Sequence, residues 1–305
     1  MERIFGGVDF SVTSAAIDWL TPADRMPWPV VAPFRMRPNL EKLDADAPAL
    51  LLRDDLADVY QRERAKVLAT HPERAMVGRA DASVLECIQN LASTRHAVGA
   101  ADAAKDGHSR RPPFPQTPAQ TASALQEDFV ILNHEADTLR TEYLSVCFPS
   151  RWDPREKLGL DFAAIHAPVA ESEQLRAAGP NLMTLAFMKQ PMLRHVWLIS
   201  PSASLDQHPD KNEAWWTEAL ADPSPLLPRL YFRIERQTTW PLPQFQRAVF
   251  FIRIMMCPLL DALSVGAGRA AELAATLRSM TPTIVAYRGM TDALPRLLAE
   301  LDSTS

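Results

Sequence analysis

Apolar residues recur along this chain with two different spacings, and each spacing predicts one class of element. Apolar positions three and four residues apart predict amphipathic helices over residues 54–69 and 82–96. Short runs rich in apolar, β-branched and aromatic residues predict strands at 129–132, 139–144, 193–199, 229–238 and 247–255, the first two forming a hairpin. Because the strands do not alternate regularly with helices, the pattern favours an α+β fold with an antiparallel sheet of about five strands over a doubly wound parallel sheet.

Proline and glycine divide the rest of the chain. Six prolines within the first fifty residues prevent long helices, so residues 1–50 are expected to form an extended arm and residues 51–305 a single α+β domain. Residues 99–118 lack any periodicity and predict a long surface loop or lid. The remaining expectations are a short helix after Pro118, a loop at 148–170, and helices at 171–188, 259–280 (interrupted at Gly266 and Gly268) and 292–301.

Composition narrows the range of partners and compartments. Hydrophobic residues make up 47% of the chain, which allows a substantial core, and 32 basic against 37 acidic residues without a dense basic block argue against nucleic acid. The longest apolar runs, such as 248–252, are far shorter than the roughly 20 residues that a membrane span requires. Three widely spaced cysteines and the lack of an export signal lead us to expect a cytoplasmic protein.

The segment from Cys147 to Val169 has the highest density of residues suited to chemistry. It combines Trp, Arg, Lys and His in a loop-like stretch that contains no GxGxxG or phosphate-loop pattern, and neither pattern occurs elsewhere in the chain. His166 is its candidate ligand, although a histidine between apolar neighbours is more often packed in a core than bound to a metal.

The strand at 229–238 carries an unusual number of charges. Alternation places Phe232 and Ile234 on one face and Arg233 and Glu235 on the other, which is also the pattern of an ordinary solvated sheet face. Arg236 falls on the apolar side, where a guanidinium requires an anionic partner such as a protein carboxylate or a cofactor propionate.

A second strand, 193–199, repeats this feature. Arg194 lies next to apolar residues, and Trp197 is available to stack on a ligand. A cation packed at the edge of the sheet would give the same pattern.

Several of these segments together resemble the haem-dependent oxidative N-demethylase family. The resemblance covers roughly residues 30 to 290 and is carried by Leu125–Leu132, the CFPSRW…EKLGL…IHAPV block, Arg194 with Trp197, and Arg233–Thr238. It implies a PAS-like haem domain with an antiparallel sheet of about five strands and flanking helices. It also implies a non-covalent haem b, and the sequence contains no CxxCH attachment motif.

The resemblance assigns roles to individual residues. His166 in the IHAPV segment would be the axial iron ligand, with His195 and His208 as the less favoured histidines. A thiolate ligand from Cys147 or Cys257 is the weaker alternative, because both cysteines end apolar runs. The other expected haem contacts are Lys157, Arg194, Trp197 and Arg236. Glu235 would anchor a cationic amine or transfer a proton, and Arg233 would steady bound oxygen or the haem propionates.

The resemblance implies a monooxygenase reaction, the oxidative N-demethylation of a small amine with O2 or peroxide. Because the chain has no flavin or iron-sulfur motif, the electrons would come from a separate reductase subunit. The family's usual asparagine before the tryptophan is replaced by Val196, which leaves the substrate open. The alternatives are a haem enzyme that hydroxylates the nitrogen of an amine or guanidine in a biosynthetic pathway, and a haem or gas sensor without catalysis.

Overall fold

The computed structural model describes residues 17–37, 39–43, 50–96, 117–135, 138–171, 173–177, 179–211 and 215–304. The predicted loop at 99–118 lies outside the described residues except for its last two positions, and so does the beginning of the predicted arm.

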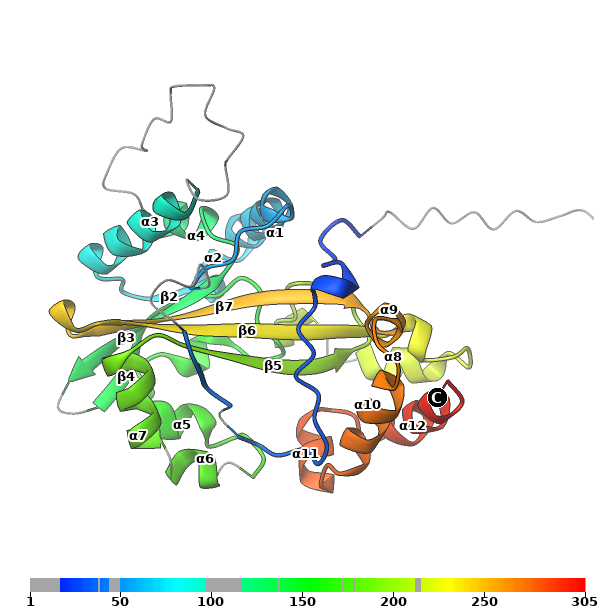
Figure 1. The fold of residues 1–305 in the computed structure, drawn as a ribbon. Helices are drawn as coiled ribbons and strands as arrows, with labels where there is room; N and C mark the ends of the chain where they lie inside the picture. Colours follow the sequence, from blue (N-terminus) through cyan, green and yellow to red (C-terminus); the bar gives the residue numbers. More distant parts are fainter. Residues whose placement is uncertain are drawn as a thin grey trace, which may run out of the picture.

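The centre of the fold is one antiparallel sheet of seven strands (Figure 1). Its order is β1-β5-β6-β7-β3-β4-β2, and every pair of neighbours is antiparallel. All five predicted strands are present, and the antiparallel arrangement is confirmed. The expected number of about five is wrong because β1 and β2 at the two edges have only two and three residues, too few to show an alternating pattern. The strands are β1 (Glu41–Lys42), β2 (Met76–Gly78), β3 (Asp128–Glu135), β4 (Thr138–Ser145), β5 (Met192–Ser200), β6 (Tyr231–Leu242) and β7 (Arg247–Pro258).

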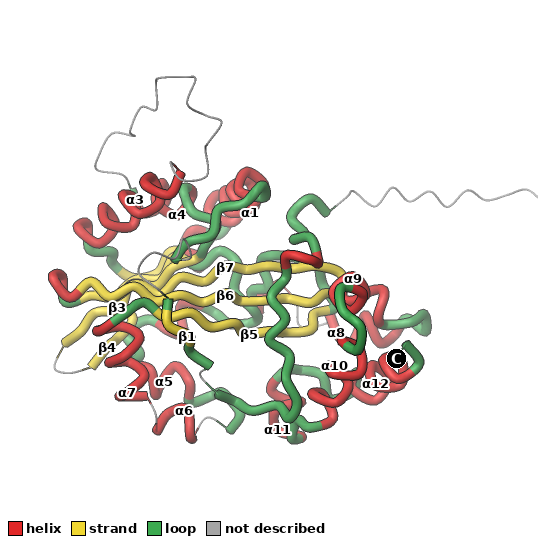
Figure 2. Tube along the Cα trace, viewed as in Figure 1, coloured by secondary structure: helices red, strands yellow, loops and turns green. Residues whose placement is uncertain are grey.

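Helices lie on both sides of the sheet and at one of its ends (Figures 1 and 2). One group, α1 to α4, covers one side, α5 to α7 lie on the other side, and α8 to α12 gather at the end where β6 begins. The helices are α1 (Ala57–Thr70), α2 (Pro72–Ala75), α3 (Ala82–His96), α4 (Pro118–Ser123), α5 (Phe162–His166), α6 (Glu173–Ala177), α7 (Gly179–Thr184), α8 (Trp215–Ala221), α9 (Leu259–Ser264), α10 (Arg269–Arg278), α11 (Pro282–Tyr287) and α12 (Leu294–Asp302).

Two of the long predicted helices are divided. The interruption expected at Gly266 and Gly268 is confirmed, because α9 ends at Ser264 and α10 begins at Arg269. The single helix expected at 171–188 is wrong. It is divided into α6, α7 and a π-helical turn, Leu185–Lys189. A Gly-Pro pair opens α7, and proline lacks the N–H group that would continue the preceding helix.

The two faces of β6 belong to different parts of the molecule. Phe232 and Ile234 are fully buried in a core formed with Trp197 and the helices at the end of the sheet. Arg236 lies on this same apolar face and is 4% exposed, as the alternation predicts. Arg233 and Glu235 on the opposite face are also buried, so this face is covered by protein rather than by solvent.

β7 extends past the start of β3, and the carbonyls of this part of β7 accept hydrogen bonds from other segments of the chain. The carbonyl of Ile254 accepts a hydrogen bond from the Tyr60 hydroxyl at 2.8 Å, and the carbonyl of Met256 accepts one from the backbone N–H of Thr21 at 2.7 Å. An unpaired strand edge would otherwise leave these carbonyls buried without partners. The described part of the predicted arm therefore packs on the domain.

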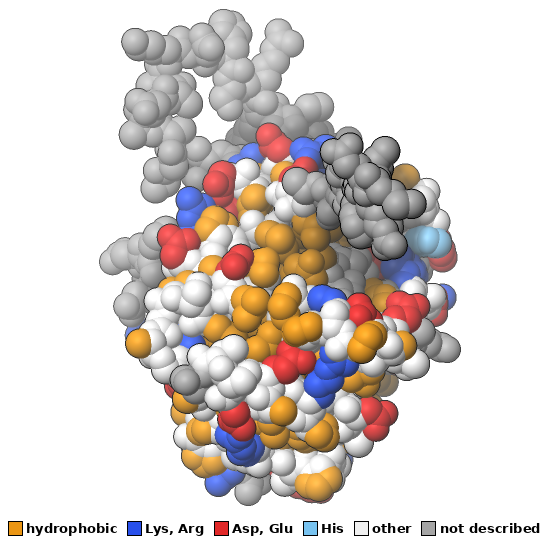
Figure 3. Space-filling view, turned by 90° about the vertical axis from the view of Figure 1, so that its right-hand side faces the viewer, with side chains coloured by type: hydrophobic (Ala, Val, Ile, Leu, Met, Phe, Trp, Pro, Cys, Tyr) orange, Lys and Arg blue, Asp and Glu red, His pale blue; other side chains and the backbone are white. Residues whose placement is uncertain are grey.

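Figure 3 shows the end of the molecule that lies at the right in Figure 1, where hydrophobic side chains gather between charged ones. Leu260 and Val265, in and just after α9, are among the exposed hydrophobic residues, at 38% and 43%. Within the described part of the chain, no helix combines the length and the apolar character needed to span a membrane.

Candidate active site

His166 ends the short helix α5 in a defined orientation. The Asp161 side chain begins this helix by accepting a hydrogen bond from the backbone N–H of Ala164 at 2.9 Å. His166 Nδ1 lies 2.8 Å from the carbonyl oxygen of Phe162, and the two rings are 4.1 Å apart. Because a carbonyl oxygen can only accept, Nδ1 carries the proton and Nε2 keeps its lone pair.

The surroundings of His166 keep its ring neutral. Burial lowers the pKa of His166, and the charges of Arg194 and Lys157 lower it further, against the hydrogen bond to Phe162, which raises it. A neutral imidazole with a free Nε2 and a hydrogen-bonded Nδ1 is the form in which histidine binds a metal.

The position of α5 is set by the edge of the sheet. The segment 157–161 runs beside β4, where the N–H of Gly159 donates to the carbonyl of Thr141 at 2.9 Å and the N–H of Thr141 donates to the carbonyl of Leu160 at 3.0 Å. The Thr141 hydroxyl also donates to the carbonyl of Lys157. These contacts hold Lys157 and the segment before α5 against β4.

One face of strands β5 and β6 carries Arg194, Arg233, Glu235 and Gln237. We call it the polar face. In the register of β5 and β6, Arg194 is opposite Gln237 and Val196 is opposite Glu235. Gln237 Nε2 donates to Glu235 Oε2 at 2.7 Å.

Arg194 has unused hydrogen-bonding capacity. Its Nε is buried and has no hydrogen-bond partner among the described residues. Burial lowers the pKa of Arg194, and the charge of Glu235 offsets this in part. A buried guanidinium donor without an acceptor costs free energy unless a further anion completes it.

Arg233 is fully buried, and its hydrogen-bond donors are used by oxygens of the protein. Its Nε donates to Ser150 Oγ at 2.8 Å, its Nη2 to the carbonyl of Phe148 at 2.9 Å, and its Nη1 to the carbonyl of Ser204 at 3.3 Å. Burial among these neutral oxygens lowers the pKa of Arg233 to about 10. The geometry makes Arg233 a residue that anchors the loop at 148–150.

Trp197 and Arg236 lie on the opposite face of the sheet from this group. Trp197 packs against Phe232 and Phe34, with ring centroids 6.2 and 6.1 Å apart. Arg236 is opposite His195 in the same register, so His195 is also on that face.

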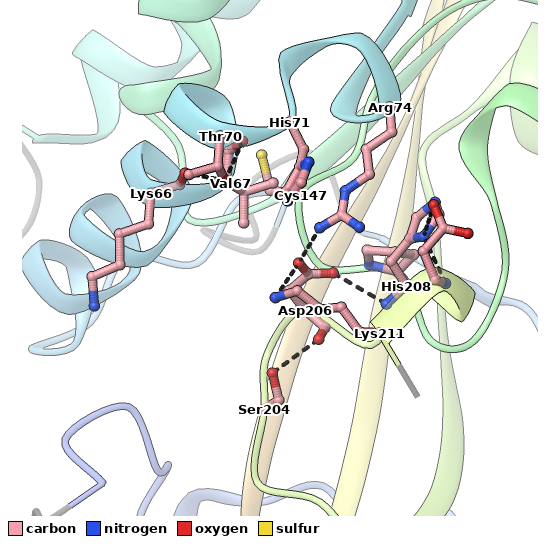
Figure 4. A network of polar contacts seen from close by, with 12 residues as sticks. Lys66, Val67, Thr70, His71, Arg74, Cys147, Ser204, Asp206, His208 and Lys211 are labelled. Carbon is pink, nitrogen blue, oxygen red and sulfur yellow. Dashed lines mark hydrogen bonds and ion pairs between the residues drawn. The ribbon is translucent and has the colours of Figure 1, made fainter. Parts of the chain in front are cut away.

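His208, one of the less favoured histidines, is buried elsewhere (Figure 4), where its Nε2 lies 3.5 Å from Asp153 Oδ1 and its Nδ1 lies 3.4 Å from Asp210 Oδ2. The structure thus brings His166, Lys157, Arg194 and Glu235 together and separates them from Trp197, Arg236 and His195.

Two residues of the site were missed from the sequence. Gln237 lies in the same motif and on the same side of the alternation as Glu235, so the alternation alone could have identified it. Tyr287 ends α11, and burial together with the Glu235 charge raises its pKa. A single tyrosine fifty residues from the nearest motif carries no sequence signal of this kind.

The polar face and the adjacent His166 of α5 together fit a haem. A haem needs an axial ligand and cationic groups for its propionates, and His166 Nε2 and the incomplete guanidinium of Arg194 are groups of the kinds that would provide these two functions. The described residues contain no group of three or more His, Cys, Asp and Glu side chains placed to hold a bare metal ion. A haem iron needs no such group, because the porphyrin supplies most of its ligands and the protein can supply a single histidine.

A comparison with protein families identifies the chain. The model of one family, described as haem-dependent oxidative N-demethylase, alpha subunit-like, matches residues 59–298. The match begins in α1 and ends in α12, so it includes all five long strands and every residue of the polar face. The chain belongs to the haem-dependent oxidative N-demethylase, alpha subunit-like family.

Proposed function

We propose that this protein is a haem-dependent monooxygenase that removes a methyl group from a small amine, and that its haem-bearing unit has a PAS-like architecture. The observation that carries the proposal is the hydrogen bond from His166 Nδ1 to the carbonyl of Phe162, which leaves Nε2 as a neutral ligand beside the incomplete guanidinium of Arg194. When bound, a haem b would supply oxygen activation and electron transfer. The overall reaction consumes O2, electrons from a reductase subunit and protons, and it releases formaldehyde, water and the shorter amine.

The chain's own residues would bind and orient the reactants. His166 would hold the iron, and Arg194 and Lys157 would neutralise the propionates. Glu235 would bind the substrate ammonium, because a carboxylate on a buried face attracts a cation strongly. Gln237 occupies Oε2 of Glu235, so Oε1 would face the amine. Arg233 would act as a positioning residue by holding the loop at 148–150 against the same face.

The absorption spectrum of the purified protein tests the ligand. We expect haem b by pyridine haemochrome, and we expect the His166→Ala variant to bind haemin at least tenfold more weakly with a changed Soret band. The matched control is His195→Ala, on the opposite face of the sheet, which should leave the spectrum and affinity unchanged. A protein that binds no haemin, or an iron site that is the same in both variants, would end the proposal.

Product analysis then tests the reaction. Glu235→Gln should reduce formaldehyde release from methylated amines and leave the haem spectrum intact. An N-hydroxylated amine or guanidine formed without formaldehyde would favour the N-hydroxylase alternative, and an intact haem without any turnover would favour a sensor.

A further inference from the structure

Glu235 lies between two aliphatic side chains on the polar face. Its partner in the register of β5 and β6 is Val196, and its partner in the register of β6 and β7 is Ile254. Directly opposed residues of antiparallel strands point to the same face, with Cβ atoms about 4.5–5.5 Å apart. Because β5, β6 and β7 are neighbours in the sheet (Figure 1), the carboxylate has a valine on one side and an isoleucine on the other.

One oxygen of this carboxylate remains for a ligand. Gln237 Nε2 donates to Glu235 Oε2 at 2.7 Å, and within the described part of the chain no residue donates a hydrogen bond to Oε1 or forms an ion pair with Glu235. Arg233, two residues away on the same face, directs its donors to oxygens of residues 148, 150 and 204. An ammonium group bound at Glu235 therefore has Oε1 as its acceptor.

The two flanking side chains differ in how far the protein covers them. Ile254 is 1% exposed and packs in a core with Tyr60 and Phe148. Val196 is partly exposed, and so is Leu198, the next residue of β5 on the same face. A ligand at Oε1 can therefore contact Val196, whose side chain ends in two methyl groups and has no hydrogen-bond acceptor.

The number of N–H groups on a protonated amine then decides how well it fits. A primary ammonium has three N–H groups, a secondary one has two and a tertiary one has a single N–H. Oε1 accepts the first, and a further N–H directed at the aliphatic flank loses its water without gaining an acceptor. A methyl group in that direction instead buries apolar area against Val196.

We propose that Val196 is a specificity-determining residue and that the site takes tertiary amines with a dimethylamino group in preference to secondary and primary amines. This inference rests on the function proposed above, because it takes Glu235 as the group that binds the ammonium.

The same arrangement favours release of the product. The reaction breaks one C–N bond and consumes O2, two electrons from the reductase subunit and two protons. One oxygen atom leaves in formaldehyde with the methyl carbon, the other leaves as water, and the nitrogen becomes that of a secondary amine. This product has one N–H more than the substrate, so the site that favours a tertiary amine binds it more weakly.

Calorimetric titration of the purified full chain with three small amines, all protonated at neutral pH, tests the preference. Trimethylamine should bind about tenfold more tightly than dimethylamine, and methylamine more weakly still, because each added N–H lacks an acceptor. Val196→Thr keeps a β-branched side chain and adds a hydroxyl that accepts an N–H. In this variant dimethylamine should gain affinity, and the ratio of its Kd to that of trimethylamine should fall to about threefold or less.

Two further variants separate this inference from the function on which it rests. Val77→Thr makes the same exchange at a partly exposed position of β2, at the far edge of the sheet, and should leave all three Kd values unchanged. Glu235→Gln should weaken the binding of all three amines, because the anionic partner of the ammonium is lost.

The outcomes distinguish the two proposals. Amine binding that Glu235→Gln weakens, but that shows no preference for trimethylamine, would overturn this inference alone. A preference that Val196→Thr leaves unchanged, or that Val77→Thr alters equally, would have the same consequence. If no amine binds, or if Glu235→Gln leaves binding unaffected, both this inference and the proposed role of Glu235 are overturned.

Discussion

Replacing Asp128 by asparagine should destabilise this protein more than any exchange of an exposed carboxylate. Asp128 lies at the start of β3, is 1% exposed and pairs with Arg64 of α1, which is fully buried, at 2.5 Å. The same carboxylate accepts hydrogen bonds from the backbone N–H groups of Cys147 and Phe148 at 2.8 and 2.9 Å. It therefore holds α1 and the beginning of the CFPSRW loop against the sheet.

The expected cost follows from the burial of the pair. Removing one partner of a buried ion pair leaves an uncompensated charge and costs about 3–5 kcal/mol. The same helix offers a matched exposed pair, Arg62 with Asp18, at 2.6 Å and with side chains 56% and 51% exposed. Such exposed pairs contribute less than about 1 kcal/mol, so Asp18→Asn should cost several times less.

Urea denaturation followed by circular dichroism and by tryptophan fluorescence measures both costs, provided that the two probes give the same transition. Adding Arg64→Met to Asp128→Asn should recover part of the loss, because the stranded guanidinium is then removed. If Asp128→Asn and Asp18→Asn shift the midpoint equally, the assignment of the buried pair as a major stabilising contact is refuted.

Two further predictions concern backbone strain and acid stability. A Cβ at Gly78 (φ +91°) would lie 2.3 Å from the carbonyl oxygen of Glu142, whereas one at Gly159 (φ +75°) would meet no atom within 4 Å. Gly159→Ala should lower the free energy of unfolding by about 1–2 kcal/mol, because the left-handed backbone alone disfavours alanine. Gly78→Ala should lower it clearly more in the same urea assay, because its Cβ also collides with a carbonyl oxygen. Equal losses in the two variants would contradict the steric argument. Burial raises the pKa of Asp153, but hydrogen bonds from Arg155 lower it to about 2. A lowered pKa stabilises the fold above the ordinary value of 3.8, and this contribution disappears as the pH falls toward 2. The melting temperature of Asp153→Asn should therefore lie below that of the wild type at pH 7 and approach it near pH 2, and a difference independent of pH would exclude this cause.

Much of the secondary structure could be predicted from local patterns. The five long strands and helices α1 and α3 have enough residues to show their periods, and the break between α9 and α10 follows from two glycines. The elements that were missed are short. For β1, β2, α2, α5, α8 and α11, which have seven residues or fewer, a local pattern carries too little information, and contacts with the rest of the fold decide the conformation.

The candidate site could be predicted only in part. His166, Lys157, Arg194 and Glu235 were identified as chemistry-bearing residues, and the structure brings them together. Trp197 was grouped with them because Arg194 and Trp197 form one of the motifs that carry the family resemblance. Adjacent side chains of a strand point to opposite faces, and three positions separate these two, so they lie on different sides of the sheet.

The sequence by itself determined which residues alternate, where the longer strands and helices run, and which motifs mark the family. Only the tertiary structure decided that Arg194 lies opposite Gln237, that Arg233 is buried beneath the loop at 148–150, and that α5 brings His166 close enough to Arg194 for their charges to interact. The physical reason is the separation along the chain over which each kind of interaction acts. Periodicity and turn preferences act between residues a few positions apart, whereas strand register and burial depend on segments that are distant in the chain and meet only when it is folded.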